Sequence, residues 1–391
     1  MIQRLELQTL TNLLKLNPVV ALLGNRQIGK TTLARLYSDK AKKETLYLDM
    51  ELDSHFNRLQ NDAESYLLKN KHKLIIIDEV QRMPKLFALL RALVDIDRKP
   101  ARFLLLGSSS PNLIKGVSES LAGRIAYLDL GGINLIEAKK SKISQDTLWL
   151  KGGFPTALNL KQNSAVYNWY ANLIKSYTEK DIKELFGVDF SSVTIRNFWS
   201  MLAHNNGNIW NKENYAKSLG VTAPTVGRYL EYMEGAFLIT RLLPWHNNSK
   251  KRLVKAPKIY IRDTGILHTL IKTKDMDDLF GHPCVGASWE GFVIEQIRQL
   301  KPENLDLYFY RTHQGTEADL VLVKGIKPVA CIEIKLSNAP QISKGFLQSI
   351  TDLKTKNNFL IMPAGDNYQS KEKINICNLS DFLSIYLKNI K

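Results

Sequence analysis

The stretch Gly24-Asn25-Arg26-Gln27-Ile28-Gly29-Lys30-Thr31 lies between an apolar run, Val19–Leu23, and a helical pattern that begins at Thr32. Its two glycines let the backbone wrap closely enough for successive N–H groups to point at one anion. The helix that follows presents its positive end to the same charge. The stretch therefore predicts a phosphate-binding loop between a strand and a helix, and the alternative is an ordinary glycine-rich turn.

The residues of this loop have distinct expected roles toward a nucleoside triphosphate. Lys30 is expected to reach the β- and γ-phosphates as a point cation, and the Thr31 hydroxyl to supply one ligand to magnesium. The expected cofactors are therefore ATP and Mg²⁺. The residues expected to contact the nucleotide are Gly24, Gly29, Lys30, Thr31 and Thr32.

A second apolar run, Leu74–Ile77, ends in two carboxylates, Asp78 and Glu79. Four consecutive aliphatic residues before the acids are typical of a buried parallel strand whose carboxyl end reaches a ligand crevice. We expect Asp78 to hold magnesium through water and Glu79 to orient and polarise the attacking water. The alternative is that the acids merely begin a solvated helix.

A third apolar run, Phe103–Gly107, is followed by Ser108-Ser109-Ser110. A polar side chain at this point can lie between the phosphate-binding strand and the acidic strand. We expect Ser108 to contact the γ-phosphate, with Ser109 as the next candidate. The alternative is a serine-rich turn that caps the next helix.

Up to about residue 130, strands alternate with helices, which predicts a parallel sheet covered on both faces. The expected strands are Val19–Leu23, Thr45–Asp49, Leu74–Asp78, Phe103–Gly107 and Ala126–Leu130.

Length, charge and cysteine content limit the class of protein. The chain has 391 residues, enough for two or three domains, and its net charge of +16 favours nucleic acid over an anionic membrane surface as a partner. No apolar run is long enough to span a bilayer and the N-terminus does not read as a signal peptide, so we expect a cytoplasmic protein. Cys284, Cys331 and Cys377 are scattered without metal-binding spacing, and we expect reduced thiols in a core.

From about Thr147 to His204 the pattern is helical, and its aromatic residues are spaced for packing in a core rather than for stacking on bases. The segment Asn208–Ile261 then predicts a helix-turn-helix. A helix over Lys212–Leu219 is followed by a turn at Gly220 and by a second helix that Thr222 caps and that runs to Glu234. Two strands, Phe237–Leu243 and Lys258–Ile261, come next.

The loop between these two strands carries four cations and no acid. A cationic tip beside a helix-turn-helix is what a winged DNA-binding module uses to grip phosphates, while side chains of the second helix face a groove. The expected DNA contacts are Thr225, Arg228, Tyr229, Lys250, Lys251, Arg252 and Lys255. The alternative is a purely structural or protein-contact unit.

The last third of the chain contains a second group of charged residues. Glu333 and Lys335 are two apart on a predicted strand and point to the same face, and Asp319 begins the neighbouring strand of a predicted hairpin. Two carboxylates that hold magnesium beside a lysine form the site of metal-dependent nucleases, and Glu290 can add a ligand from a helix. The alternative is a solvated strand face with an ordinary Glu-x-Lys alternation.

The whole chain resembles a widespread prokaryotic family that joins an AAA+-type ATPase to a C-terminal domain of uncharacterised function related to PD-(D/E)xK nucleases. The motifs that carry the resemblance are Gly24–Thr31, Ile77–Arg82, Gly107–Ser110, Leu121–Arg124, Gly152–Pro155, Lys180–Ile182, Lys258–Tyr260, Asp263–Gly265, Glu317–Asp319 and Glu333–Lys335.

The resemblance implies an AAA+ fold, ATP hydrolysis and a role for Arg124 as an arginine finger or sensor. A finger comes from the neighbouring subunit, so it implies a homo-oligomer, possibly a ring, whereas the alternative is a surface arginine that caps a helix end. Two positions depart from the family pattern. Leu106 replaces a usual threonine, which weakens the assignment of Ser108, and Leu130–Asn134 replaces a proline-bearing turn after the fifth strand.

Together these observations predict an α/β protein with four parts. We expect a P-loop AAA+ core over residues 1–140, a helical lid over 141–205, a winged helix-turn-helix over 206–262 and a restriction-nuclease-like domain over 263–391. The expected function is a magnesium-dependent ATPase that acts on DNA, with nuclease activity as an open question. The alternative is a nucleotide-switched regulator or scaffold whose C-terminal domain only binds DNA or protein.

Overall fold

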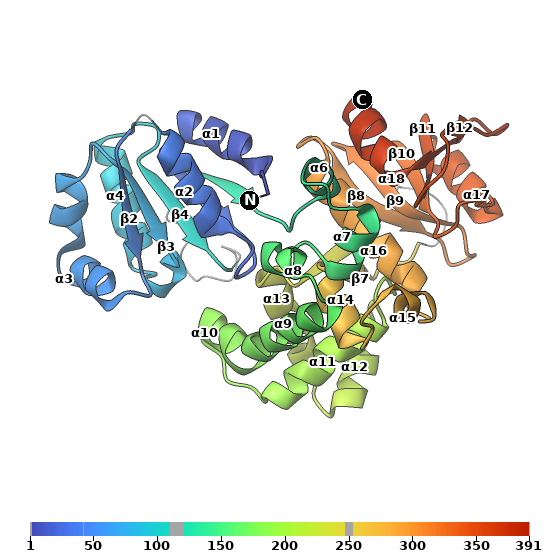
Figure 1. Ribbon diagram of the computed structural model, residues 1–391, viewed down its shortest axis with the longest axis horizontal. Coiled ribbons are helices and arrows are strands. Elements are labelled where there is room, and N and C mark those ends of the chain that lie inside the picture. Colours follow the sequence, from blue (N-terminus) through green and yellow to red (C-terminus); the bar gives the residue numbers. More distant parts are fainter. Residues whose placement is uncertain (1, 42, 110–120, 247–252, 391) are drawn as a thin grey trace.

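The computed structural model describes residues 2–41, 43–109, 121–246 and 253–390. These residues form an N-terminal module (residues 2–129), a largely helical middle module (155–270) and a C-terminal module (285–390), which lie side by side in Figure 1. A linker with two short helices leads from the N-terminal module to the middle module.

The N-terminal module is built on five parallel strands in the order β2-β3-β4-β1-β5. Because β4 lies between β1 and β3, the residues that follow these three strands meet at one edge of the sheet. The strands are β1 (Val19–Leu23), β2 (Thr45–Asp49), β3 (Leu74–Asp78), β4 (Phe103–Gly107) and β5 (Ile125–Asp129).

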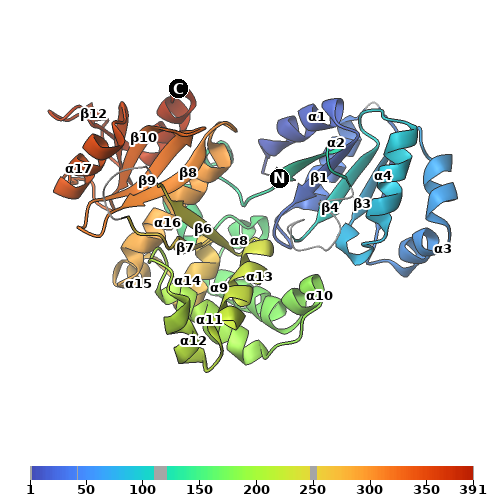
Figure 2. The same cartoon turned by 180° about the vertical axis from the view of Figure 1, so that it is seen from behind.

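Helices cover both faces of this sheet. Side chains alternate along β1, so Val20 and Leu22 pack with α1 and α2, whereas Val19 and Ala21 pack in the core that α4 covers. Figure 2 shows α4 in front of the sheet, with α1 and α2 behind it. The helices are α1 (Glu6–Leu16), α2 (Lys30–Lys40), α3 (Asp53–Lys69) and α4 (Leu86–Ile96).

The apolar core on the α1 and α2 side continues into the middle module, where Tyr170, Tyr177 and Trp199 are fully buried. A π-helical turn, Tyr177–Asp181, interrupts the helices there. No helix of the described residues is apolar over enough turns to cross a bilayer. The helices of the linker and middle module are α6 (Leu135–Lys140), α7 (Gln145–Lys151), α8 (Pro155–Asn159), α9 (Asn163–Ser176), α10 (Ile182–Phe186), α11 (Ser192–His204), α12 (Lys212–Leu219), α13 (Ala223–Gly235) and α14 (Thr264–Leu270).

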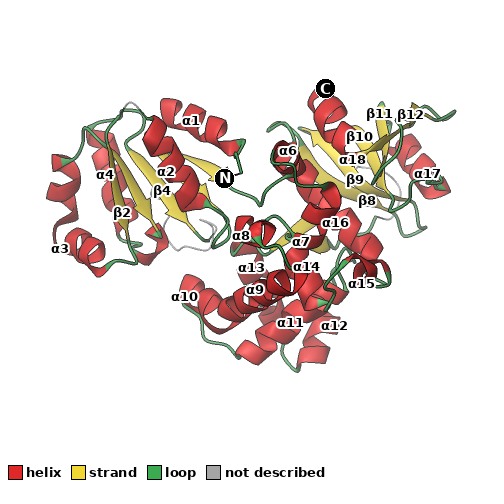
Figure 3. Ribbon diagram, viewed as in Figure 1, coloured by secondary structure: helices red, strands yellow, loops and turns green. Residues whose placement is uncertain are grey.

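A second sheet has eight strands in the order β12-β13-β11-β10-β9-β8-β6-β7 (yellow in Figure 3). Its strands are β6 (Ile239–Pro244), β7 (Lys258–Ile261), β8 (Asp306–Arg311), β9 (Glu317–Lys324), β10 (Lys327–Ile334), β11 (Asn357–Met362), β12 (Tyr368–Gln369) and β13 (Asn375–Asn378). The accompanying helices are α15 (Met276–Phe280), α16 (Val285–Leu300), α17 (Lys344–Leu353) and α18 (Leu379–Asp381).

The hairpin of β6 and β7 is therefore shared between modules. It follows the helix pair α12 and α13, yet the end of β6 pairs in parallel with β8, at Leu243 opposite Tyr308 and Pro244 opposite Phe309. The predicted hairpin thus has one strand joined to the C-terminal sheet. The predicted winged module did not include this pairing with the C-terminal sheet and stays a prediction.

The predicted elements are largely confirmed, and the parallel sheet and the core role of the helical aromatics agree with the structure. The fifth strand was misplaced by one residue, since it spans Ile125–Asp129. The strand expected from Phe237 begins instead at Ile239, because Phe237 adopts a left-handed conformation with φ 61° that no strand accommodates.

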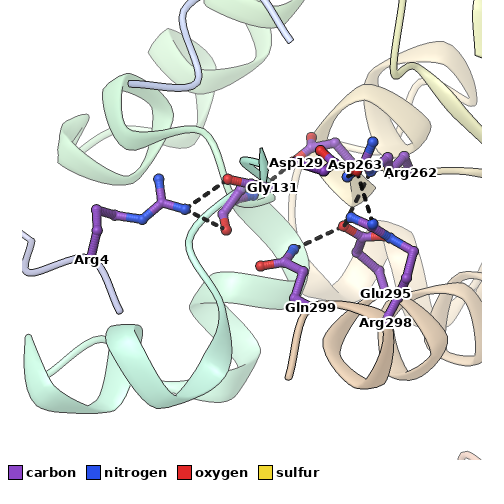
Figure 4. Close-up of polar contacts among 10 residues, drawn as sticks. Arg4, Asp129, Gly131, Arg262, Asp263, Glu295, Arg298 and Gln299 are labelled. Carbon is purple, nitrogen blue, oxygen red and sulfur yellow. Dashed lines mark hydrogen bonds and ion pairs between the residues drawn. The ribbon is translucent and has the colours of Figure 1, made fainter. Parts of the chain in front are cut away.

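The turn after β5 brings the three modules together. The Arg4 guanidinium donates to the carbonyl oxygens of Gly131 at 2.8 Å and Gly132 at 3.4 Å, as Figure 4 shows for Gly131. A Cβ on Gly132 would lie 2.9 Å from the Cα of Gly153, and one on Gly131 would meet the side chain of Gln299. The absence of a side chain at Gly131 and Gly132 therefore permits this close approach.

We predict that Gly132→Ala lowers stability by about 1–3 kcal/mol, because the new methyl group would press on backbone that cannot move aside. Gly131→Ala is the matched control and should cost less, since the flexible Gln299 side chain can turn away. Thermal melting of both variants measures the difference. Equal melting temperatures for the two variants would contradict this account of the turn.

Candidate functional site

The loop between β1 and α2 has the geometry of a phosphate cradle. Gly29 is left-handed at φ 104°, and a Cβ on Gly24 would lie 2.4 Å from the carbonyl oxygen of Leu130, so both positions require glycine. The first amide groups of α2, which begins at Lys30, have no partner within the helix and are free to face an anion.

The Lys30 ammonium is buried at the mouth of this loop. It donates to the carbonyl oxygens of Gly24 at 3.0 Å and Asn25 at 2.9 Å and to the Ser108 hydroxyl at 2.9 Å. Burial lowers the pKa of Lys30 to about 8, although the nearby carboxylates of Glu79 and Asp78 oppose this. The hydrogen-bond partners of Lys30 are all neutral, so a bound phosphate would supply the negative charge that they do not provide.

The two acids after β3 take different positions. Asp78 Oδ2 accepts from the Thr31 hydroxyl at 2.7 Å and from the Tyr47 hydroxyl at 2.5 Å. A hydroxyl and a carboxylate oxygen side by side next to a phosphate loop are the donor set that magnesium takes from protein, so these two residues fit the ion. Sequence reasoning missed Tyr47, because nothing along the chain brings a residue of β2 to Asp78.

Glu79 lies on the other side, toward Ser108. Its backbone is left-handed at φ 52°, which is uncommon for a residue other than glycine and tends to occur at functional sites. Its carboxylate accepts from the Ser108 hydroxyl at 3.1 Å and from the Gln81 side-chain amide. The structure thus brings Lys30, Thr31, Asp78, Glu79 and Ser108 together as predicted, with Ser108 between the lysine and the acid.

The remaining predicted nucleotide residues are placed less centrally. Thr32 is exposed on α2, and Ser109 is fully buried with no hydrogen-bond partner for its hydroxyl among the described residues. Ser110 lies outside the described residues.

A cleft of about 510 Å³ opens beside this site, between the N-terminal module and the π-helical turn of the middle module. The residues that line it are Arg26, Glu51, Glu79, Gln81, Arg82, Pro84, Ser108, Lys180, Asp181, Glu184 and Leu185. The acid Glu79 and the hydroxyl of Ser108 therefore face a space that the middle module closes.

Arg26, inside the phosphate loop, connects the two sides of this cleft. Its guanidinium pairs with Asp181 at 2.5 Å and with Glu51 at 2.7 Å, and its main-chain N–H donates to the Tyr177 hydroxyl at 2.9 Å. Asp181 falls in the Lys180–Ile182 motif of the resemblance, but sequence reasoning gave that motif no role. The pairing is invisible in the sequence because the loop and the helix are far apart along the chain.

Arg124 lies away from this chain's own nucleotide site. It precedes β5 and so stands at the amino-terminal edge of the sheet, opposite the phosphate loop, where its guanidinium pairs with Asp95 at 2.6 Å and 3.0 Å. From that edge Arg124 is not placed to contact this chain's own phosphate loop. The arginine-finger role and the oligomer stay predictions.

In the C-terminal module, the predicted acids and lysine are neighbours. Glu333 pairs with Lys335 at 2.9 Å, and Asp319 accepts from the main-chain N–H of Ile334 at 2.8 Å. Burial, followed by the negative charge of Glu290, raises the pKa of Asp319 to about 7. Within the described residues, however, Glu290, Asp319 and Glu333 do not form a group whose ligand atoms all lie within 4.8 Å of one another.

A lysine to which the sequence analysis gave no role in this site lies among these acids. Lys258 of β7 is 4% exposed, and its ammonium pairs with Glu290 at 3.0 Å and with Glu317 at 2.9 Å. Burial alone would lower the pKa of Lys258, but Glu290, Asp319 and Glu317 outweigh it and hold the pKa above its usual value. Tyr260 adds a hydrogen bond to Glu290 at 2.5 Å.

The predicted DNA contacts of the middle module are only partly available. Arg228 and Lys255 are exposed, and Thr225 shares a hydrogen bond with the cap residue Thr222. Tyr229 is a wrong prediction, because its ring is buried against Phe190 and Phe198 and faces no groove. Lys250, Lys251 and Arg252 lie outside the described residues.

Comparison with known families gives each module a match. Residues 16–138 match the family described as an AAA domain. Residues 143–277 and 285–382 match two families described as domains of unknown function, DUF8612 and DUF4143. The strand order, the phosphate loop and the AAA domain define the chain as an AAA-type ATPase, whereas the relation of its C-terminal part to nucleases stays a prediction.

Two relatives from mycobacteria share most of the chain. The uncharacterized proteins Rv2008c of Mycobacterium tuberculosis and Mb2031c of Mycobacterium bovis are each 39% identical over 357 residues, covering 91% of this chain and 79% of theirs. The chain therefore belongs to the same protein family as these two.

Solved structures with some likeness include a Walker-type ATPase of Pyrococcus abyssi, 15% identical with a TM-score of 0.48, covering 69% of this chain and 96% of that one. Another is a signal transduction ATPase with numerous domains and a tetratricopeptide repeat sensor from Pyrococcus horikoshii. It is 14% identical with a TM-score of 0.30, covering 76% of this chain and 48% of that one.

Proposed function

We propose that the chain hydrolyses ATP in the presence of magnesium and that the N-terminal site couples this reaction to the middle module. The observation that carries the proposal is the position of Ser108. Its hydroxyl accepts a hydrogen bond from the phosphate-loop lysine, Lys30, and donates one to the acid Glu79. Magnesium, when bound, neutralises negative charge on the phosphates.

Each residue of the site has a task that its position supports. Lys30 stabilises the negative charge of the terminal phosphates. Thr31 and Asp78 supply oxygen ligands to magnesium. Glu79 holds the attacking water and polarises it, and Ser108 turns its single hydroxyl hydrogen from Glu79 to the γ-phosphate when the nucleotide binds. Because Glu79 lines the cleft beside the middle module, closure of the cleft excludes bulk water from the reaction.

We predict that Glu79→Gln lowers the rate of ATP turnover by roughly 10²–10⁴-fold while ATP still binds, because the amide keeps the shape but cannot accept a proton. Phosphate release under steady-state conditions and binding of a fluorescent ATP analogue measure the two effects separately. Glu64→Gln, an exposed change on α3, is the control. Unchanged turnover in Glu79→Gln would remove that residue from the mechanism.

We further propose that the substrate on which this ATPase acts is DNA. Supporting observations are the net charge of +16, the helix-turn-helix of α12 and α13, and the exposed side chains of Arg228 and Lys255. Because the neighbouring Tyr229 is buried in the core, Arg228 is the one of these two residues that can contact DNA. Its contact would go to a phosphate or a base edge. Coupling to the nucleotide runs through Arg26 and Asp181, which join the phosphate loop to the same module.

Arg228→Ala is expected to weaken DNA binding and to lower the slope of log affinity against log salt by about 1, as the loss of one phosphate contact does. Titrations of duplex and single-stranded DNA at several salt concentrations measure this, and DNA should raise the wild-type rate of ATP turnover. Arg58→Ala, an exposed arginine on α3, serves as the control. If wild-type protein binds no DNA even at low salt, the substrate is not DNA.

For the C-terminal module, we propose the non-cutting alternative, in which the nuclease-like site binds no metal. The supporting observation is Lys258, a buried cation paired with Glu290 and Glu317 beside Asp319. A divalent ion in the same place would meet the repulsion of the ammonium, and the carboxylates are already neutralised in part.

We predict that the wild type cuts no DNA with Mg²⁺ or Mn²⁺. The Lys258→Ala variant should gain a Mn²⁺ site. The double variant Lys258→Ala with Asp319→Ala should lose that site again. Removing one partner of a buried ion group also costs about 3–5 kcal/mol, so added Mn²⁺ should restore part of the lost melting temperature. Electron paramagnetic resonance of free Mn²⁺ measures the binding, with the exposed Lys327→Ala as the control. Metal-dependent cutting by the wild type that Asp319→Ala abolishes would overturn this assignment.

A further inference from the structure

Three side chains outside both charged sites converge where the middle module meets the C-terminal module. His204 is the last residue of α11, and His282 and Cys284 belong to the turn before α16. One ligand atom from each, two imidazole nitrogens and the Cys284 sulfur, all lie within 4.8 Å of one another. The sequence analysis placed the cysteines without metal-binding partners because His204 lies far away along the chain.

Existing contacts hold these groups near one another. The main-chain N–H of Cys284 donates to Nδ1 of His282 at 3.1 Å, and the Cys284 thiol donates to the main-chain oxygen of His204 at a longer 3.6 Å. The two imidazole rings lie with their centroids 6.2 Å apart. The contact of the thiol is weak, so a metal–sulfur bond would replace little.

The surroundings of the three groups leave room for an ion. Cys284 is half-buried at the start of α16. A bound metal ion deprotonates a thiol outright. His204 is exposed, so an ion can enter from solvent.

We propose that His204, His282 and Cys284 bind one transition-metal ion of the zinc class. Imidazole nitrogen and thiolate sulfur suit zinc and exclude Mg²⁺ and Ca²⁺, which take oxygen ligands. Three protein ligands leave a fourth position for water or an outside group. The ion fastens the end of α11 to the start of α16, and so joins the helix-turn-helix region to the C-terminal module.

The test uses the full chain, stripped with a chelator and then titrated with Zn²⁺ and separately with Co²⁺. We expect about one zinc per chain by elemental analysis. The Co²⁺ form should show the absorption of a tetrahedral site together with a thiolate-to-cobalt charge-transfer band. Zinc should also raise the melting temperature, because it binds only the folded arrangement.

Cys284→Ser should abolish the charge-transfer band and weaken zinc binding by more than the roughly 10–100-fold that loss of an outer-shell partner costs. His204→Ala should weaken binding as well, whereas His313→Ala, an exposed histidine elsewhere, is the matched control and should bind as the wild type does. Circular dichroism and ATP turnover report whether each variant is folded. Failure of the wild type to bind zinc, or equal binding by a folded Cys284→Ser variant, overturns the proposal.

Discussion

A buried ammonium group needs oxygen atoms around it, and the arrangement of the N-terminal module meets that need for Lys30. Two of its three partners are carbonyl oxygens of the phosphate loop, and the third is Ser108 at the end of β4. Ser108 is within reach only because β4 lies between β1 and β3. The strand order therefore determines which residue stands between the lysine and Glu79, and the site depends on that order more than on any single motif.

The same edge of the sheet is where the other modules attach. The chain leaves β5 at Asp129, whose carboxylate accepts from Arg262 at 2.8 Å and from Arg298 at 3.1 Å, a network drawn in Figure 4. Arg262 follows β7 and Arg298 lies on α16, so one acid of the ATPase sheet contacts elements of both other modules. With Arg26 bound to Asp181, the nucleotide loop and the end of the sheet are both tied to the rest of the chain. These contacts are the path that the proposed coupling of the nucleotide site to the middle module would take.

Local patterns were sufficient for most elements and for the nucleotide site. The runs Val19–Leu23 and Leu74–Asp78 are fully buried strands because unbroken aliphatic sequence has no solvated face to offer. What the sequence could not reveal depends on pairing between distant segments. Lys258 lies among the acids because its strand β7 pairs with β6, which joins the C-terminal sheet at β8. Tyr229 is buried because Phe190 and Phe198 pack against its ring. Neither contact leaves a periodicity in its own segment.

The two charged sites contain similar residues, and the position of the cation decides what each can do. In the N-terminal module, Lys30 is held by neutral oxygen atoms and the acid Glu79 faces a cleft, so a triphosphate brings the negative charge that completes the site. In the C-terminal module, Lys258 stands directly between two carboxylates and neutralises them in part without a ligand. Carboxylates that already hold a buried cation make a poor receptor for a metal ion, since the ion must first displace a strong partner. A motif of two acids and a lysine therefore does not define an activity until the position of every nearby cation is known.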